Sequence, residues 1–257
     1  MEYRVTCVPV CPVRKDPAHR SEMISQLLFG EKCILMESVD GWEKVQAKYD
    51  GYEGWVQSGQ VTVIDEHKFN KKDNLLTEGL VNEIDFNGYN MMIPIGCSLS
   101  AFNSGLTPWN KNSVKYKGEF WDIENVKFSG KAIRQFSFRF LNTSYLWGGK
   151  SVYGIDCSGF VQTVYKFFDK YIPRDSSQQA EEGETIDFLQ SAKCGDLAFF
   201  DNEDGKIVHV GMLLNSDEII HSSTKVRIDK IDNHGIVNRD TNKRTHHLRI
   251  IKRFFLE

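Results

Sequence analysis

Residues 145–168 read YLWGGKSVYGIDCSGFVQTVYKFF. A glycine-rich loop leads to Cys157, after which apolar residues recur at helical spacing: Phe160, Val161, Val164, Phe167 and Phe168. Cys157 therefore lies at the N-terminal tip of a predicted helix. Unpaired backbone N–H groups and the positive end of the helix dipole favour an anion there. We therefore expect a Cys157 thiol pKa below the usual value of about 8.5.

A single cysteine on an apolar helix stripe is more often a small buried hydrophobe than a nucleophile. Two histidines further along favour the nucleophile. If residues 215–217 form a three-residue loop between His209 and His221, then His221 lies opposite Gly211. The two histidines then share one sheet face, with Cα atoms ~7–8 Å apart; a two-residue loop would put them on opposite faces. On one face beside Cys157 they would supply the base and its orienting group.

The composition limits the function classes. The chain has 257 residues, 40% of them hydrophobic, and a net charge of −3, and this length suggests two or three domains. Interspersed charges argue against a nucleic-acid partner or an anionic membrane surface, and no apolar run approaches the ~20 residues of a membrane span. Without a signal-peptide pattern we expect a cytoplasmic protein, or a periplasmic or cell-envelope one if the N-terminus was truncated. We expect a monomer.

Six scattered cysteines do not predict a disulfide framework. Cys7 and Cys11 are a weak metal pair without a second pair at ligand spacing, so we expect neither a metal nor a cofactor. The other histidines are interpreted as ordinary core or surface residues: His19, His67, His234, His246 and His247.

Residues 1–65 are predicted to be all-β, because short apolar runs alternate with the turn dipeptides Asp40-Gly41 and Asp50-Gly51. The motifs LLFGE, DGWEKV and GYEGWV follow in order and resemble a bacterial SH3-type (SH3b) barrel. The polar run 65–74 is interpreted as a solvated linker or strap. Residues 66–127 are predicted to form a second, divergent SH3-like barrel, with strands near 90–96 and 115–120.

Residues 128–257 are predicted to be α+β, with helices packed on one side of an antiparallel sheet. One further helix is predicted at 131–140, and strands are predicted at 197–200, 207–214, 218–221 and 248–251.

Four motifs in this part carry a family resemblance: DCSGF at 156–160, GDLAFF at 195–200, HVGM at 209–212 and IHSS at 220–223. Together they resemble the NlpC/P60 family, which are papain-like cysteine peptidases of bacterial peptidoglycan. The resemblance implies Cys157 as nucleophile, His209 as general base and His221 as the group that orients His209.

The combination with SH3b domains resembles the subgroup that cleaves γ-D-glutamyl–diamino acid bonds in murein peptides with a free N-terminal L-alanine. The resemblance implies that the first SH3b domain closes over the active site. It implies the following substrate-binding residues: Glu22, Tyr52, Tyr145, Asp156, Ser158, Arg174 and Ser176. Glu22 and Asp156 would pair with an ammonium group, and Arg174 would bind the D-Glu α-carboxylate.

Two other functions stay open. The chain could be a non-catalytic wall-binding SH3b protein, although an inactive domain has no reason to keep Cys157, His209 and His221. It could also be another thiol amidase or acyltransferase on the papain-like scaffold, because a fold does not fix a function. Whether the diamino acid is meso-diaminopimelate or L-lysine is left open.

Overall fold

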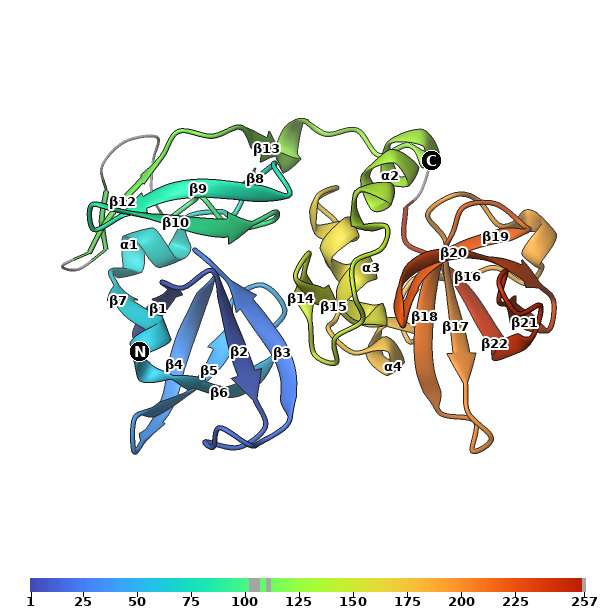
Figure 1. Cartoon of the computed structure of the whole chain (residues 1–257), viewed down its shortest axis with the longest axis horizontal. Helices are drawn as coiled ribbons and strands as arrows, with labels where there is room; N and C mark the ends of the chain where they lie inside the picture. The colour runs from blue at the N-terminus through green and yellow to red at the C-terminus, as the bar shows by residue number, and fades with distance from the viewer. Residues whose placement is uncertain (102–106, 110–111, 256–257) are drawn as a thin grey trace. The chain divides into compact units, whose positions relative to one another are not determined.

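The computed structural model describes residues 1–101, 107–109 and 112–255, which fall into two compact units. The first unit contains Met1–Val126 and Trp147–Tyr153, and the second contains Lys127–Leu146 and Gly154–Glu257. Both are mostly β (Figure 1). Within the described ranges, α2 (Gly130–Ser137) and α3 (Cys157–Lys166) are the only α-helices of eight or more residues. The predicted three-domain division stays a prediction.

The N-terminal sheet of the first unit has the strand order β3-β2-β6-β5-β4-β1-β7. The predicted Asp40-Gly41 turn is confirmed: both residues have positive φ, and the flanking Val39 and Trp42 pair across it. The strands are β1 (Glu2–Thr6), β2 (Val10–Arg14), β3 (Met23–Leu28), β4 (Lys32–Val39), β5 (Trp42–Ala47), β6 (Glu53–Gln57) and β7 (Val61–Ile64).

A second sheet in the same unit has the order β10-β9-β12-β11, and β8 pairs separately with β13. The predicted strand at 115–120 is interrupted by a bend at Gly118, which a 2.5 Å hydrogen bond from the Tyr116 hydroxyl to the Glu119 carbonyl spans. The strands are β8 (Leu75–Thr77), β9 (Val81–Phe86), β10 (Tyr89–Pro94), β11 (Thr107–Trp109), β12 (Asn112–Tyr116) and β13 (Phe120–Asp122).

The polar run 65–74 is not a solvated linker. It contains helix α1 (Glu66–Asn70), which Asp65 caps and whose Phe69 is buried. The fully buried Lys32 ammonium donates to the Lys71 carbonyl at 2.6 Å and lies 3.1 Å from an Asp73 carboxylate oxygen. Burial lowers the pKa of Lys32 to about 8, opposed by Asp73. Of the two predicted alternatives, a solvated linker or a strap, the contacts of Lys71 and Asp73 with Lys32 favour the strap.

One hydrophobic core joins the two sheets of the first unit. Val5, Leu28 and Phe29 of the N-terminal sheet pack in the same cluster as Ile84 and Trp109 of the second sheet. The Phe29 and Trp109 rings are stacked, with centroids 5.0 Å apart. The two predicted SH3-like regions thus share a core.

The second unit is built on a sheet of order β16-β22-β17-β18-β19-β20-β21, and β22 also pairs with β21, which closes the sheet. Helix α3 packs against β18 and β19, as the predicted helix-on-sheet arrangement requires. The strands are β16 (Glu184–Thr185), β17 (Leu197–Asp201), β18 (Ile207–Leu213), β19 (Glu218–Ser223), β20 (Lys225–Asp232), β21 (Gly235–Val237) and β22 (Arg244–Arg253).

Smaller elements complete the units. They are the 3-10 turns Ser58–Gln60, Ile123–Asn125, Phe138–Phe140 and Leu189–Ser191, the short strands β14 (Lys150–Ser151) and β15 (Gly154–Ile155), and helix α4 (Ser176–Gln179). Within the described residues, no helix has both the length and the apolar character that a membrane crossing requires.

We predict that Phe69→Ala lowers the free energy of unfolding of the first unit by about 3–5 kcal/mol, because it empties a buried site in α1. The matched control is His67→Ala, an exposed position on the same helix, which should change it by less than about 0.5 kcal/mol. Urea unfolding followed by circular dichroism measures both. Equal, small effects would mean that this run is solvated after all.

Candidate active site

Cys157 is the first residue of α3, as predicted. The helix begins there because the Asp156 side chain accepts the Gly159 backbone N–H at 2.7 Å and caps it. Helix α3 packs against β18, and the backbone N–H of Val210 on that strand lowers the pKa of the Cys157 thiol. Cys157 therefore lies beside the strand that carries His209.

The predicted register of the two histidine strands is confirmed. Leu214 N–H donates to the Glu218 carbonyl at 2.9 Å, which makes a three-residue loop, and Met212 pairs with Ile220. Gly211 is therefore opposite His221, whose Cβ would lie 2.8 Å from any Cβ at position 211.

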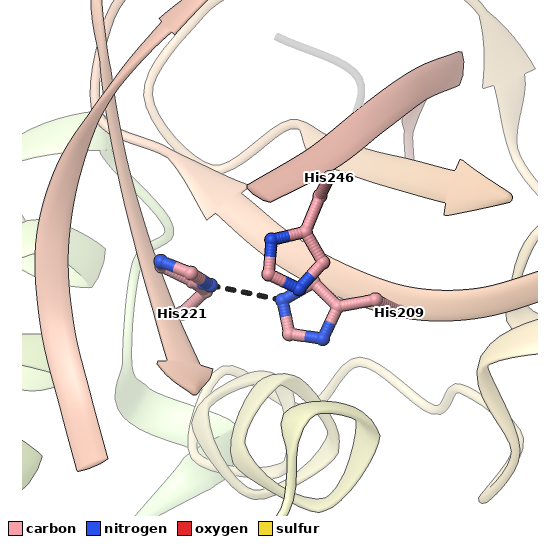
Figure 2. A group of neighbouring side chains, drawn as sticks. All are labelled: His209, His221 and His246. Carbon is pink, nitrogen blue, oxygen red and sulfur yellow. Dashed lines mark hydrogen bonds between the residues drawn. The ribbon is translucent and has the colours of Figure 1, made fainter. Parts of the chain in front are cut away.

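The two histidine rings meet as expected from this register. His209 Nε2 and His221 Nδ1 are 2.9 Å apart (Figure 2). Glycine at 211 leaves the room that the His221 side chain needs on this face.

A carboxylate behind His221 was not predicted. Asp229 on β20 has an oxygen 3.1 Å from His221 Nε2, while Arg227 and the Arg239 backbone N–H donate to its other oxygen at 2.9 Å. Burial opposes ionisation of Asp229, but hydrogen bonds from His221, Arg239 and Arg227 lower its pKa to about 2. Asp229 is therefore a charged acceptor at neutral pH. The only indication of Asp229 in the sequence is its position two residues after Arg227, the residue that pairs with His221.

Asp229 determines which nitrogen of each histidine carries a proton. An ionised carboxylate only accepts, so His221 Nε2 donates to it and His221 Nδ1 is left bare. His221 Nδ1 then accepts from His209 Nε2–H, which leaves Nδ1 of His209 bare. Burial lowers the pKa of both His209 and His221, so both rings are neutral. His209 Nδ1 is thus a free base.

His246, predicted to be an ordinary core or surface residue, also belongs to this group. Its ring, from β22, stacks on His209 with centroids 4.1 Å apart and an interplanar angle of 25° (Figure 2). One ring nitrogen from each of His209, His221 and His246 lies within 4.8 Å of the others, a set that could hold a metal ion. No sequence spacing indicates this cluster, because the strands meet only in the closed sheet.

The expected low pKa of Cys157 is wrong. Burial, and to a lesser extent the Asp156 carboxylate, raises the pKa of the Cys157 thiol to about 12. The Val210 N–H, Arg174 and the Ser158 N–H lower this pKa but do not offset the increase. The side chain is only 7% exposed, so the cost of desolvating a thiolate exceeds the helix-tip effect. With His209 also neutral, Cys157 rests as a thiol.

Four predicted substrate residues of the second unit lie around Cys157. Arg174, 1% exposed, donates to both Asp156 oxygens at 3.1 and 2.6 Å and to Ser158 Oγ at 2.7 Å. Burial first, then electrostatic interaction with Cys157 and Asp156, raises the pKa of Tyr145 to about 12. Arg174 and Asp156, predicted to bind opposite groups of a substrate, are thus bonded to each other.

The three remaining predicted substrate residues lie on α4 and in the first unit. Ser176 begins the short helix α4 of the second unit. Glu22 and Tyr52 belong to the first unit, where exposed Glu22 accepts a 2.8 Å hydrogen bond from the Trp147 indole. The substrate roles of all three stay predictions.

Family models match parts of the first and the third predicted regions. Residues 142–245 match the model described as the NlpC/P60 family, and residues 13–61 match the bacterial dipeptidyl-peptidase Sh3 domain. The γ-D-glutamyl-L-lysine dipeptidyl-peptidase of Bacillus subtilis is 29% identical over 77% of this chain and 71% of its own. The Bacillus cereus protein of the same name is 29% identical over 79% of this chain and 68% of its own.

A crystal structure of an NlpC/P60 family protein from Bacillus cereus superposes with a TM-score of 0.79 at 19% identity, over 98% of this chain and 99% of that one. This likeness shows that the two chains share a fold.

The raised pKa of Cys157 predicts how it reacts. Alkylation of Cys157 by iodoacetamide should accelerate about tenfold per pH unit between pH 7 and 9, because only the thiolate reacts. Peptide mass spectrometry of timed samples measures the rate, with the half-buried Cys194 as an internal comparison. A fast rate that stays constant from pH 5 to 8 would instead reveal a preformed thiolate–imidazolium pair.

Proposed function

We propose that this chain is a cysteine peptidase of peptidoglycan stem peptides. It carries an NlpC/P60 domain, preceded in the sequence by a bacterial dipeptidyl-peptidase SH3 domain. It hydrolyses the γ-D-glutamyl–diamino acid bond of peptides with a free N-terminal L-alanine and releases L-Ala-γ-D-Glu. The proposal rests on the hydrogen-bonded series from Asp229 through His221 to His209. His209 lies on β18, the strand beside Cys157.

The proposed reaction uses this series directly. His209 Nδ1 takes the Cys157 proton as the sulfur attacks the γ-carbonyl carbon, so the thiolate forms only with substrate present. Backbone N–H groups at the start of α3 stabilise the developing oxyanion.

The tetrahedral intermediate then collapses. The imidazolium of His209 returns its proton to the leaving amine, which leaves a thioester on Cys157. Water, deprotonated by His209, hydrolyses the thioester and restores the thiol. Asp229 stabilises the transient positive charge through His221.

The Arg174–Asp156 ion pair recognises the charged groups of the substrate. Both side chains are buried beside Cys157, and neither would be stable there as a lone charge. A substrate that brings both an ammonium and a carboxylate adds one partner to each side chain and keeps the site neutral. A dipeptide end with a free amine and the D-Glu α-carboxylate meets that requirement.

The same proposal extends to the fold. The second unit is a papain-like α+β domain, supported by α3 packed on β18 and β19 and by the Cys157 tip facing that sheet. Residues 66–127 form a divergent SH3-like barrel, supported by the β9–β10 hairpin and the sheet β10-β9-β12-β11.

Mass spectrometry of a digest of L-Ala-γ-D-Glu-L-Lys tests the activity, with L-Ala-γ-D-Glu as the expected product. Cys157→Ala should lower kcat by at least about 10⁴-fold, because it removes the nucleophile. The matched control is Cys194→Ala, half-buried in the same unit outside the site, which should keep full activity. N-acetylation of the peptide should reduce kcat/KM by at least about a hundredfold, because it leaves buried acceptors unpaired.

The other outcomes separate the alternatives. Peptide binding without cleavage would indicate a wall-binding protein. Cleavage at a different bond, or transfer to an added amine in place of water, would indicate another thiol acyl-transfer activity.

A further inference from the structure

The group of three histidines brings one more ring nitrogen close to the pair than peptide hydrolysis needs. Hydrolysis uses His209 and His221, but His246 adds a third ring nitrogen within 4.8 Å of theirs. In a tetrahedral zinc site with Zn–N distances near 2.1 Å, ligand nitrogens lie about 3.4 Å from one another. The 2.9 Å separation of His209 Nε2 and His221 Nδ1 needs to widen by only about half an ångström. The half-buried His246 ring, now stacked on His209, has to turn so that its ring plane points at the same ion.

Metal-binding histidines usually hydrogen-bond through the ring nitrogen that does not contact the metal, and two histidines of this cluster do so. His221 Nε2 is 3.1 Å from Asp229, the carboxylate–histidine arrangement that orients metal ligands. His246 Nδ1 is 2.9 Å from Thr245 Oγ1, which leaves its other ring nitrogen on the side of His209 (Figure 2). Two ligands are thus oriented by partners that already exist.

Burial leaves one side of the cluster accessible. His209 and His221 are 6% and 1% exposed, while His246 is half-buried and is the ring that an ion can reach from solvent. Three imidazoles leave the fourth position of a tetrahedral ion for water. Neutral nitrogen ligands of this kind suit zinc and its first-row neighbours rather than calcium or magnesium.

We propose that His209, His221 and His246 form a binding site for a divalent transition metal ion of the zinc class, and that the bound ion holds the peptidase inactive. The binding depends only on the geometry, whereas the inhibition rests on the proposed function. A metal on His209 Nε2 displaces the proton from that nitrogen, so the neutral ring carries its proton on Nδ1. Nδ1 then no longer accepts the Cys157 proton, and the thiol is not activated.

Binding is tested in the Cys157→Ala background, which removes the nearby thiol as a ligand. Titration of Zn²⁺ against a chromogenic chelator should show one site with a dissociation constant in the micromolar range or tighter. Adding His246→Gln should weaken this site at least about tenfold. The matched control, His247→Gln, changes the exposed neighbour on the same strand and should leave the affinity unchanged.

A second measurement needs no histidine variant. Zn²⁺ should shift the ring ¹⁵N resonances of His209, His221 and His246 together in the Cys157→Ala protein. No site, equal effects of the two glutamine variants, or shifts confined to other histidines would overturn the metal site.

Activity is measured separately. Zn²⁺ should abolish hydrolysis by the wild-type protein, and EDTA should restore it. Full activity of the zinc-loaded protein would overturn the inhibitory role. A protein that hydrolyses no peptide, with or without EDTA, would refute the proposed function and the inhibition that rests on it, while the binding data would still decide the metal site.

Discussion

The hydrogen bond between Asp229 and His221 is the interaction on which the active site depends. Asp229 is buried yet ionised, because Arg227 and the Arg239 backbone N–H also donate to it. An ionised acceptor there permits only one arrangement of protons along the series, and that arrangement ends with a bare nitrogen on His209. Replacing the carboxylate by a group that donates would reverse the order and leave the base protonated.

Two glycines allow the close packing that brings the three histidines together in the closed sheet. Gly211 gives the His221 side chain room on the shared face, where a Cβ would come within 2.8 Å of it. Gly235 lets β21 approach β22, since a Cβ there would lie 1.8 Å from the His246 carbonyl oxygen, and its positive φ of 130° suits glycine. The second contact fixes the strand that carries His246.

The two histidines could be predicted from the sequence because their spacing is local. A three-residue loop and a side-chain period of two suffice to place His209 and His221 on one face. The start of α3 at Cys157 is also local, because the Asp156 cap and the apolar spacing both lie within a few residues.

Other features depended on contacts that no local pattern encodes. Asp229 joins the active site because of the register of β20 against β19. His246 joins it because β22 closes the sheet. The Cys157 pKa was mispredicted, because the helix tip is visible in the sequence whereas the depth of burial is not. The choice between a solvated linker and a strap for the run 65–74 could not be made from the sequence, because its polar composition hides buried Phe69 and the partners of Lys32.

The proton arrangement itself can be measured. Ring ¹⁵N NMR of the reduced, metal-free protein at pH 7 reports which nitrogen of each histidine carries hydrogen. We predict that His209 and His221 are both neutral, each with hydrogen on Nε2 and a bare Nδ1. Hydrogen on Nδ1 of His209, or a charged imidazolium in the resting protein, would contradict it.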